Sequence, residues 1–419
     1  MNQIVTPATP QHAPMTQFPV AGNILQVGGQ PLTDIARQVR QHHGQRPFYV
    51  YDREVMNRQV QALREQLPAG IHLHYAMKAN PMPEVVSHLA AQTDGLDVAS
   101  HGELAIALGT GIDPASISFA GPGKSSADLR AAIEAGVIIN MESSGELQRI
   151  TELALQMGIR PKVAVRVNPD FELKTSGMKM SGGPKPFGVD AEQVPAMLQD
   201  IHQRELDFMG FHIFCGSQNL KSDAIIDAQN KTFALARQLA DAAPMPLRWL
   251  NIGGGLGIPY FPGEQRLALG AIGENLQSLL EHYSDITCDS EVVMELGRYL
   301  VAEAGLYVCE VIDVKSSRGE TFVVTNGGLH HHLAASGNFG QVIRKNYPVC
   351  VANRMTSDSM ETVSVVGPLC TPLDILASKM TLPKVQPGDL IALYQSGAYG
   401  FSASPQNFLG HPEAIELVV

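Results

Sequence analysis

Lys78 is the residue of this chain whose type and position most suggest chemistry. It follows a short β-type run, His74–Met77, and an Ala-Asn-Pro sequence turns the chain directly after it. A lysine in that position is expected to project from the end of a sheet, where an enzyme can hold an amine for Schiff-base formation with a carbonyl cofactor. An isolated strand-end lysine is usually an ordinary surface residue, so this interpretation depends on what other segments place beside it.

Two further segments carry groups that suit a phosphorylated heterocyclic cofactor. The run Gly253–Gly257 contains four glycines, so its backbone N–H groups can approach a phosphate closely. The next strand-like run ends in Glu295-Leu-Gly-Arg298, where the guanidinium suits bidentate phosphate binding and the carboxylate can hold a proton on a ring nitrogen. A tight turn and a salt bridge would explain these residues separately, but their succession favours a shared site.

The segment Phe211–Gln218 closes another strand-like run with side chains that could meet a planar cofactor. The imidazole of His212 or the ring of Phe214 could stack on it, and Ser217 could donate a hydrogen bond to its phosphate. A buried histidine with a satisfied hydrogen bond is the alternative for His212.

Three features of the last hundred residues complete the set of candidates. The rigid loop Gly367–Asp374 displays the thiol of Cys370 and the carboxylate of Asp374, and Tyr399 lies in a Gly-Ala-Tyr-Gly turn. The run His330–His332 invites a metal interpretation, but adjacent side chains on an extended chain point in alternate directions and cannot all converge. No metal site is predicted.

The elements that must position these residues alternate between strand-like and helical patterns from about residue 47 to 300. The predicted strands are His72–Lys78, Leu96–Ser100, Ile117–Gly121, Val137–Met141, Lys162–Asn168, Phe208–Phe214, Trp249–Gly253 and Glu291–Glu295. The amphipathic stretches between them include Arg53–Gln66, Gly102–Leu108, Ser125–Ala135 and Asp223–Ala242. Eight such units predict a parallel (β/α)8 barrel over residues 46–301. An open doubly wound sheet is the alternative, because periodicity does not reveal closure.

Helical periodicity ends near residue 302, which predicts a second, all-β domain over residues 302–419. Its expected strands are Leu306–Val314, Thr321–Thr325, Thr362–Val366, Leu390–Tyr394 and Ala414–Val418. Residues 1–45 are expected to contribute an N-terminal strand to this domain, with Gly22–Val27 as the candidate.

The composition bears on the partners and the location of the protein. The chain has 419 residues and a net charge of −11, which argues against nucleic acid or an anionic membrane as its main partner. No apolar run approaches the roughly 20 residues that a membrane helix needs. Residues 1–22 do not have the pattern of a secretory signal, and the five cysteines contain no CxxC pair. Reduced thiols and a cytoplasmic location are therefore expected.

An ordered set of motifs then identifies a family. YAMKAN, GLDVASHGEL, FHIFCGSQ, GGGLG, ELGR, GPLCTPLD and SGAYG follow one another from about residue 47 to the C-terminus. Together they resemble the fold-type III pyridoxal-phosphate decarboxylases, which include diaminopimelate and ornithine decarboxylases. The resemblance implies an alanine-racemase-like barrel, a C-terminal β domain, and a homodimer whose shared active sites receive the cysteine loop from the partner subunit.

The same resemblance implies roles in binding pyridoxal 5'-phosphate. Lys78 is the implied Schiff-base lysine, and Glu295 pairs with the pyridine nitrogen, which keeps the ring protonated as an electron sink. Asp97 and Arg166 order the strand ends. The residues implied to surround the phosphate are Ser217, Gly254, Gly255, Arg298 and Tyr399.

Further implied roles concern catalysis and the substrate. Cys370 is the implied acid that protonates the carbon from which CO2 leaves. His212 and Phe214 lie beside the cofactor. The residues expected to face the substrate are Thr371, Asp374, His331 and Tyr399.

Departures from the family pattern bear on the substrate. Thr371 stands where polyamine and diaminopimelate enzymes carry an acidic residue for the distal ammonium, and a neutral hydroxyl cannot repay the desolvation of a buried cation. The stretch 328–334 lacks the arginine that diaminopimelate decarboxylases use for the distal carboxylate. Phe214 replaces the stacking histidine, and His212 corresponds to a histidine further upstream.

The combination of GGLHHH, GPLCTP, SGAYGFSASPQNFLGHP and NIGGGLGIPYF resembles a subgroup that includes the butirosin-type decarboxylases of carrier-protein-bound glutamate and the exosortase-associated decarboxylases. We therefore expect a decarboxylase whose aminoacyl substrate is tethered to an acyl carrier protein. Diaminopimelate decarboxylation in lysine synthesis is the alternative. A non-catalytic regulatory homologue and an amino-acid racemase are further alternatives, although both fit the retained Lys78 and Cys370 less well.

Overall fold

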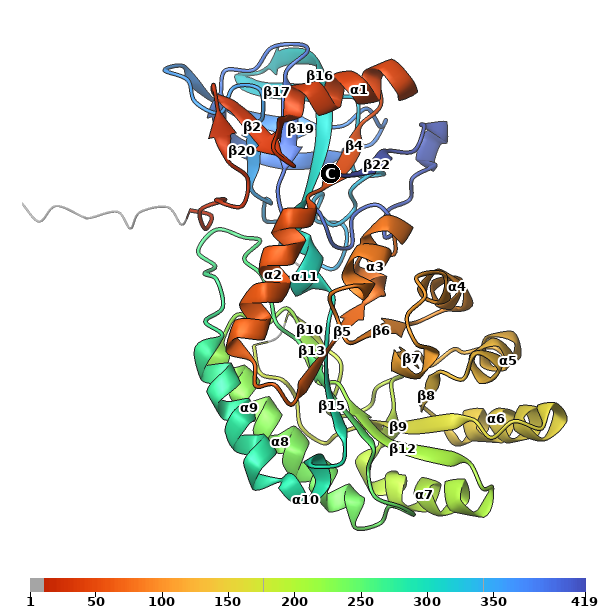
Figure 1. Cartoon of the computed structure of the whole chain (residues 1–419). Coiled ribbons are helices and arrows are strands. Elements are labelled where there is room, and N and C mark those ends of the chain that lie inside the picture. Colours follow the sequence, from red (N-terminus) through yellow and green to blue (C-terminus); the bar gives the residue numbers. More distant parts are fainter. Residues whose placement is uncertain (1–10, 176, 342) are drawn as a thin grey trace, which may run out of the picture. The chain divides into compact units, whose positions relative to one another are not determined.

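The computed structural model describes residues 11–175, 177–341 and 343–419. The chain divides into two compact units (Figure 1). The barrel unit comprises Met56–Gly257 and Leu267–Val301, and the β unit comprises Met1–Val55, Ile258–Arg266 and Ala302–Val419. The β unit is therefore assembled from three separate stretches of sequence.

Eight parallel strands close into a barrel in the barrel unit. They are β5 (Ile71–Ala76), β6 (Gly95–Val98), β7 (Ile117–Phe119), β8 (Ile138–Met141), β9 (Lys162–Asn168), β12 (Asp207–Ile213), β14 (Trp249–Gly254) and β15 (Glu291–Leu296). Each strand pairs with the next in this order, and β15 pairs back with β5. The predicted (β/α)8 barrel is confirmed. The open-sheet alternative is wrong, because the β15–β5 pairing leaves the sheet no free edge there.

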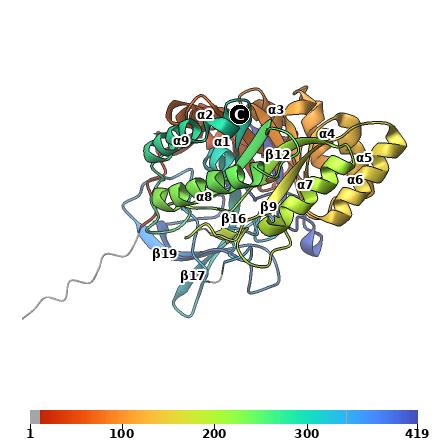
Figure 2. The ribbon, with the colours of Figure 1, turned by 90° about the horizontal axis from the view of Figure 1, so that it is seen from below.

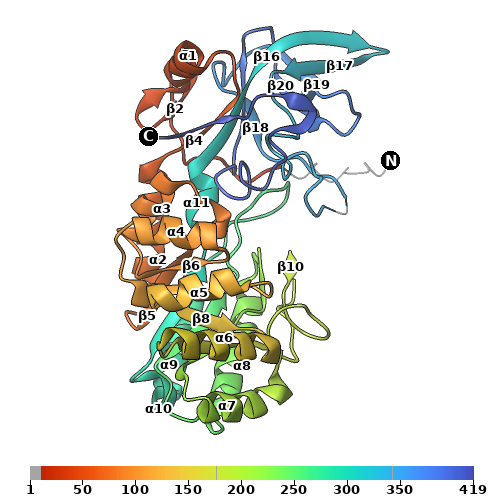
Figure 3. The same cartoon turned by 90° about the vertical axis from the view of Figure 1, so that its right-hand side faces the viewer.

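Helices cover the outside of the barrel strands. They are α2 (Arg53–Gln66), α3 (Pro83–Ala90), α4 (His101–Gly109), α5 (Ser126–Ala135), α6 (Ser144–Met157), α7 (Val194–Gln203), α8 (Ser222–Ala240), α9 (Gly270–His282), α10 (Ser284–Thr287) and α11 (Arg298–Val301). Figure 2 shows α6, α7 and α8 around β9 and β12. Figure 3 shows α4, α5 and α6 one below the other, outside β6 to β8.

Serine caps start several of these helices close to the ends of strands. Ser100 and Ser143 each accept a hydrogen bond of 3.1 Å from the backbone N–H three residues later. Gly136 and Gly158 end α5 and α6 in the left-handed conformation that glycine tolerates. Because the barrel strands are parallel, their carboxyl ends lie on one rim, and the serine caps start the following helices close to that rim.

The interior of the barrel has an apolar layer with a polar layer above it. Ile138, Ala164, Trp249 and Val293, from β8, β9, β14 and β15, pack together as a buried cluster. Side chains two residues apart on a strand share a face. The residues two positions further along these same strands are Asn140, Arg166, Asn251 and Glu295. The polar layer therefore lies toward the carboxyl ends of the strands.

The β unit is built around a long strand, β16 (Gly305–Ser317). The other strands of its main sheet are β4 (Phe48–Tyr51), β17 (Glu320–Thr325), β18 (Val349–Val351), β19 (Met360–Val366), β20 (Ile375–Pro383), β21 (Leu390–Leu393) and β22 (Ile415–Val418). Most pairs are antiparallel, but β17–β19 and β4–β22 are parallel. The expectation of a separate β domain is confirmed. The strands β4, β18 and β20 had no counterpart among the predicted strands.

Two short elements precede this sheet along the chain. The strands β1 (Val20–Ala21), β2 (Ile24–Val27) and β3 (Gln30–Pro31) form a three-stranded sheet of their own, and α1 (Leu32–His43) follows. The N–H of Leu25 on β2 donates a 2.8 Å hydrogen bond to the carbonyl of Ala352 in the β unit. Across the described ranges, no helix is long and apolar enough to cross a membrane.

Candidate active site

Lys78 lies in a single 3-10 turn, Met77–Ala79, directly after β5. Its Nζ is 3.9 Å from Oε1 of Glu295 and 5.5 Å from the centroid of the Phe214 ring. Gly297 permits this approach, because a Cβ there would be 2.7 Å from the carbonyl oxygen of Ala76. The lysine, the carboxylate and the aromatic ring that the sequence placed on three separate strands therefore meet at the end of the barrel.

Glu295 is buried on β15 and surrounded by groups that favour its ionised form. Nδ2 of Asn251 donates to Oε2 at 3.1 Å, and Nε2 of His212 lies 3.1 Å from the same oxygen. Burial by itself would raise the pKa of Glu295, but the charge and hydrogen bond of His212, with the charges of Lys78 and Arg166, lower it well below its usual range. The site therefore holds a carboxylate that can accept a proton-bearing ring nitrogen.

The glycine-rich segment at the end of β14 forms a tight cradle beside Glu295. Gly253 and Gly255 have positive φ angles of 67° and 82°. A Cβ on Gly254 would be 2.1 Å from the carbonyl oxygen of Glu295, and one on Gly255 would be 2.6 Å from that of Gly216. Only glycine fits these positions, and the absence of side chains leaves the backbone open to an anion.

Asp97, at the end of β6, belongs to a buried chain of polar groups. Its Oδ1 accepts a hydrogen bond from the hydroxyl of Ser118, and it is 3.6 Å from Nδ1 of His74. The other ring nitrogen of His74 is 3.4 Å from Glu291. Burial alone would lower the pKa of His74, but hydrogen bonds and charges from Asp97 and Glu291 raise it to about 9.

Arg166, on β9, pairs with a second buried carboxylate at 2.9 Å, that of Glu142. Glu142 also accepts hydrogen bonds from the N–H groups of Gly121 and Gly188 at 2.6 and 3.1 Å. Burial would raise the pKa of Glu142, but the charges of Arg166 and Lys124 lower it. The arginine is therefore held in place rather than free to move in the site.

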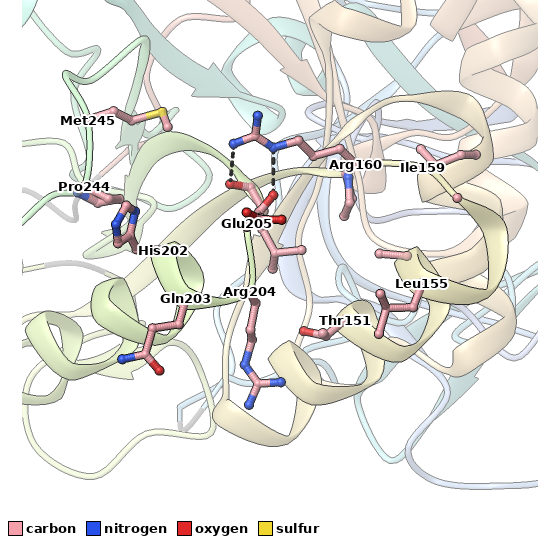
Figure 4. Close-up of a pocket in the computed structure, with 14 residues that line it drawn as sticks. Thr151, Leu155, Ile159, Arg160, His202, Gln203, Arg204, Glu205, Pro244 and Met245 are labelled. Atoms are coloured by element: carbon pink, nitrogen blue, oxygen red, sulfur yellow. Dashed lines mark hydrogen bonds between the residues drawn. The ribbon is translucent and has the colours of Figure 1, made fainter.

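A cavity of about 440 Å³ lies where these groups meet, and its lining includes Lys78, Asp97, Arg166 and Glu295. Its size is in the range of small-molecule and cofactor sites. A larger surface groove of about 880 Å³ lies elsewhere on the same unit (Figure 4). Its lining comes from residues before β9 and β12, at the opposite ends of these strands, so the smaller cavity is the candidate active site.

Arg298 and Ser217 each follow a residue of the site by three positions along the chain, Glu295 and Phe214 respectively. Arg298 begins α11, three residues after Glu295. Ser217 lies in the short strand β13 (Gly216–Ser217), which pairs with β10 (Met178–Lys179) and follows Phe214. Both residues are partly exposed. Their positions are compatible with contact to an anion held by the glycine cradle.

The remaining predicted residues lie in the β unit. On the Gly367–Asp374 loop, Cys370 is exposed and Thr371 is partly exposed. Asp374 is buried at the end of this loop, where its Oδ1 accepts the N–H of Leu329 at 2.6 Å and its Oδ2 accepts the N–H of Leu369 at 2.8 Å. Both oxygens of this carboxylate are thus used to hold two loops together.

His331 and Tyr399 also belong to the β unit. His331 is buried, its Nε2 is 2.9 Å from the carbonyl of Pro412, and its Nδ1 is 3.3 Å from the hydroxyl of Tyr307. Burial lowers the pKa of His331 to about 4. Tyr399 is partly buried with a positive φ of 52°. The structure thus gives His331 two partners inside the β unit, and a substrate contact by it stays a prediction.

Comparison with known proteins identifies the family. Residues 53–302 match the family model for the pyridoxal-binding domain of pyridoxal-dependent decarboxylases. The chain belongs to this family, and it is a pyridoxal-phosphate-dependent amino-acid decarboxylase.

Relatives of known activity cover most of the chain. The L-glutamyl-[BtrI acyl-carrier protein] decarboxylase of Niallia circulans is 37% identical over 89% of this chain and 88% of its own length. A Staphylococcus aureus enzyme, 2-[(L-alanin-3-ylcarbamoyl)methyl]-2-hydroxybutanedioate decarboxylase, is 31% identical over 87% and 92%. The structure of Helicobacter pylori diaminopimelate decarboxylase complexed with L-lysine is 29% identical, covers 91% and 93%, and has a TM-score of 0.81.

The residues of the barrel unit fit the cofactor of this family. The glycine cradle excludes side chains where a phosphate needs backbone N–H groups, and the ionised Glu295 suits a protonated ring nitrogen. Lys78 supplies an amine within reach of the same carboxylate. The cradle therefore suits the phosphate of pyridoxal phosphate, the Glu295 carboxylate suits its ring nitrogen, and the Lys78 amine suits its aldehyde.

The sequence interpretation did not include several buried polar residues of the site. Asn251 contacts Glu295, Glu142 holds Arg166, and His74 lies beside Asp97. For Asn251 a signal was present, because it is two residues after Trp249 on the strand and thus on the same face as the barrel core. Glu142 lies on a connection after β8, where its direction could not be inferred from the pattern.

Proposed function

We propose that this enzyme decarboxylates an aminoacyl group, such as glutamyl, that is tethered to an acyl carrier protein. The observation that carries the proposal is the chemistry of the Gly367–Asp374 loop. It offers the exposed thiol of Cys370 and the partly exposed hydroxyl of Thr371, while its one carboxylate, Asp374, is buried and bonded to two backbone N–H groups. The loop thus presents no acidic group to a distal ammonium.

The names of two relatives support a substrate without a distal ammonium. The Niallia circulans enzyme is named for a glutamyl group on a carrier protein. The Staphylococcus aureus enzyme is named for an amino acid whose side chain ends in an amide and a hydroxybutanedioate. Decarboxylation beside the amino group consumes the α-carboxylate, so a carrier thioester of glutamate must use the side-chain carboxyl.

Within this function we assign roles to the residues of the barrel unit. When bound, pyridoxal phosphate supplies an electron sink for the pair of electrons that CO2 leaves behind. Lys78 holds the cofactor covalently through Nζ. Glu295 keeps the proton on the ring nitrogen, and its low pKa supports this role.

The remaining contacts of the cofactor in this proposal orient it. Asp97 and Arg166 fix the ends of β6 and β9, and His212 and Phe214 line the ring. The groups that hold the phosphate are Ser217, Gly254, Gly255, Arg298 and Tyr399.

Cys370 delivers the proton that completes the reaction in this proposal. Its Sγ–H transfers a proton to the α-carbon after the bond to the carboxylate has broken, and solvent returns a proton to the sulfur. Thr371 faces the acyl side of the substrate, with His331 and Asp374 behind it. The exposure of Cys370 supports access by a substrate.

We further propose that the enzyme is a homodimer with shared active sites and that it is cytoplasmic. The five cysteines are free, which fits a reducing compartment. Mixing unfolded Lys78→Ala and Cys370→Ala chains and refolding them tests the shared site. Mixed dimers then contain one intact site, so about a quarter of wild-type activity is expected for random pairing. If the refolded mixture has no activity, the active site is not shared between the two subunits.

The substrate is tested by measuring CO2 release from two compounds. One is the pantetheine thioester of the glutamate side-chain carboxyl, and the other is free meso-diaminopimelate. We expect rapid turnover of the thioester and slow turnover of the free diamino acid, with Lys78→Ala inactive on both. Rapid turnover of meso-diaminopimelate would instead support the diaminopimelate decarboxylase alternative.

A further inference from the structure

Asn251 is a buried residue at an irregular point of the barrel. It lies on β14, where it pairs with Val293 of β15, whereas Gly254 pairs with Glu295. Two residues of β14 therefore stand opposite one residue of β15 between these pairs, which is a β-bulge. Bulges of this kind redirect a side chain near an active site, and here the strand continues into the glycine cradle.

The side-chain amide of Asn251 bonds on both sides of this bulge. Its Oδ1 accepts the N–H of Gly253 at 2.8 Å, which stabilises the turn into the cradle. Its Nδ2 donates to Oε2 of Glu295 at 3.1 Å. An amide is required for this arrangement, because it combines an acceptor for the backbone N–H with a donor for the carboxylate. The opposite orientation of the amide would place oxygen against oxygen.

The two oxygens of Glu295 consequently have different surroundings. Oε2 lies 3.1 Å from Nδ2 of Asn251 and 3.1 Å from Nε2 of His212. Oε1 faces Nζ of Lys78 at 3.9 Å. Glu295 and Lys78 both line the 440 Å³ cavity. Oε2 is therefore contacted by side chains of other barrel strands, and Oε1 is the oxygen on the side of the cavity.

We propose that Asn251 is a positioning residue for Glu295, holding Oε2 so that Oε1 is presented to the ring nitrogen of pyridoxal phosphate. This inference rests on the role of Glu295 in the proposed function. Asn251 acts only through Glu295 and the adjoining cradle. It therefore couples the two ends of the cofactor site, the ring-nitrogen acceptor and the phosphate cradle, through one side chain.

Three variants and a matched control test this role. Asn251→Asp keeps the shape but replaces the donor with a second carboxylate. Glu295→Gln removes the charge. In the double variant the new amide on β15 can donate to the new carboxylate on β14, which restores the hydrogen bond but moves the charge off β15. Asn353→Asp is the control, because Asn353 bonds to the buried Asp389 and to the N–H of Leu390, both at 2.9 Å, in the β unit.

Two quantities are measured for each variant: the melting temperature of the cofactor-free protein and the dissociation constant for pyridoxal phosphate, followed by visible absorbance. We expect Asn251→Asp to lower the melting temperature and to weaken cofactor binding by about tenfold to a hundredfold, as for a lost hydrogen bond to a charged group. The double variant should regain the melting temperature but bind the cofactor as weakly as Glu295→Gln. Asn353→Asp should lower the melting temperature alone.

Two outcomes overturn the inference. Cofactor binding by Asn251→Asp that equals wild type shows that Asn251 does not position Glu295. Recovery of both melting temperature and cofactor affinity in the double variant shows that the hydrogen bond has only a structural role. Absence of cofactor binding by the wild-type protein contradicts the proposed function instead, and the melting temperatures still test the bond between Asn251 and Glu295. If Asn251→Asp alone does not fold, the comparison of the double variant with Glu295→Gln decides between these outcomes.

Discussion

Replacement of Asp374 by Asn should loosen the loop that carries Cys370. In the wild-type protein, Oδ1 and Oδ2 of Asp374 accept the N–H groups of Leu329 and Leu369 at 2.6 and 2.8 Å. Asparagine has one acceptor oxygen, so its NH2 group must face one of the two N–H donors. One charge-assisted bond is lost and one buried N–H is left without an acceptor.

The surroundings of Asp374 prevent an easy adjustment. A Cβ on Gly328 would be 2.2 Å from Oδ1 of Asp374, and one on Gly367 would be 2.3 Å from Oδ2. The two glycines bring both loops into contact with the carboxylate, so little room remains for a new rotamer or a water molecule. Burial raises the pKa of Asp374, so removal of the buried charge offsets part of the loss. We expect a local cost of about 2–4 kcal/mol.

Amide hydrogen exchange, read by mass spectrometry, measures this cost directly. The amides of Leu329 and Leu369 should exchange roughly 30-fold to 1,000-fold faster in Asp374→Asn, because local opening becomes easier by that free energy. Asp389→Asn is the control: Asp389 is also a buried carboxylate of the β unit, and it accepts the N–H of Gln386 at 2.9 Å. Its substitution should leave the exchange of Leu329 and Leu369 unchanged. Wild-type exchange rates of both amides in Asp374→Asn would refute the reasoning.

Four further outcomes follow from the site and its surroundings. The free energy of unfolding should fall by about 3 kcal/mol as pH rises from 6.5 to about 9, because the folded state holds His74 protonated. In urea titrations at several pH values, His74→Asn should remove this dependence on pH. Below pH 6.5 the free energy of unfolding should instead fall as the pH falls, because burial lowers the pKa of His332 to about 3. This loss should continue down to about pH 3 and should be less steep in His332→Gln. Glu142→Gln should cost about 3–5 kcal/mol in urea unfolding by leaving the buried Arg166 without its partner; a loss below 1 kcal/mol, as for surface pairs, would contradict this. Thr371→Glu should raise kcat/KM for free meso-diaminopimelate about tenfold or more, and unchanged kinetics would refute a role in choosing the substrate.

Much of the barrel could be predicted from the sequence because its signals are local. The strand Lys162–Asn168 and the helix Arg53–Gln66 have the predicted bounds, since each has a clear period and clear breaks. Closure was inferred from the count of eight, and the pairing of β15 with β5 confirms it. The helix α1 and the strands β4, β18 and β20 were missed.

The residues of the candidate site could be predicted where a residue type seldom has another structural role at its position. Lys78 at a strand end, the glycine run and Glu295 belong to this group, and the structure brings them together. Asn251 and Glu142 were missed because asparagine and glutamate are common in turns and on helices. Their function comes from burial beside Glu295 and Arg166, which depends on strands far apart in the sequence.

The sequence by itself determined the family, the cofactor and the order of the elements, because these depend on residue types and local periods. The tertiary structure decided which oxygen of Glu295 faces the cavity and that Asp374 holds a loop. A carboxylate has the same chemistry wherever it occurs in a chain. Its role is set by the donors that burial places around it, and those donors come from neighbouring strands and loops that only the folded chain brings within hydrogen-bonding distance.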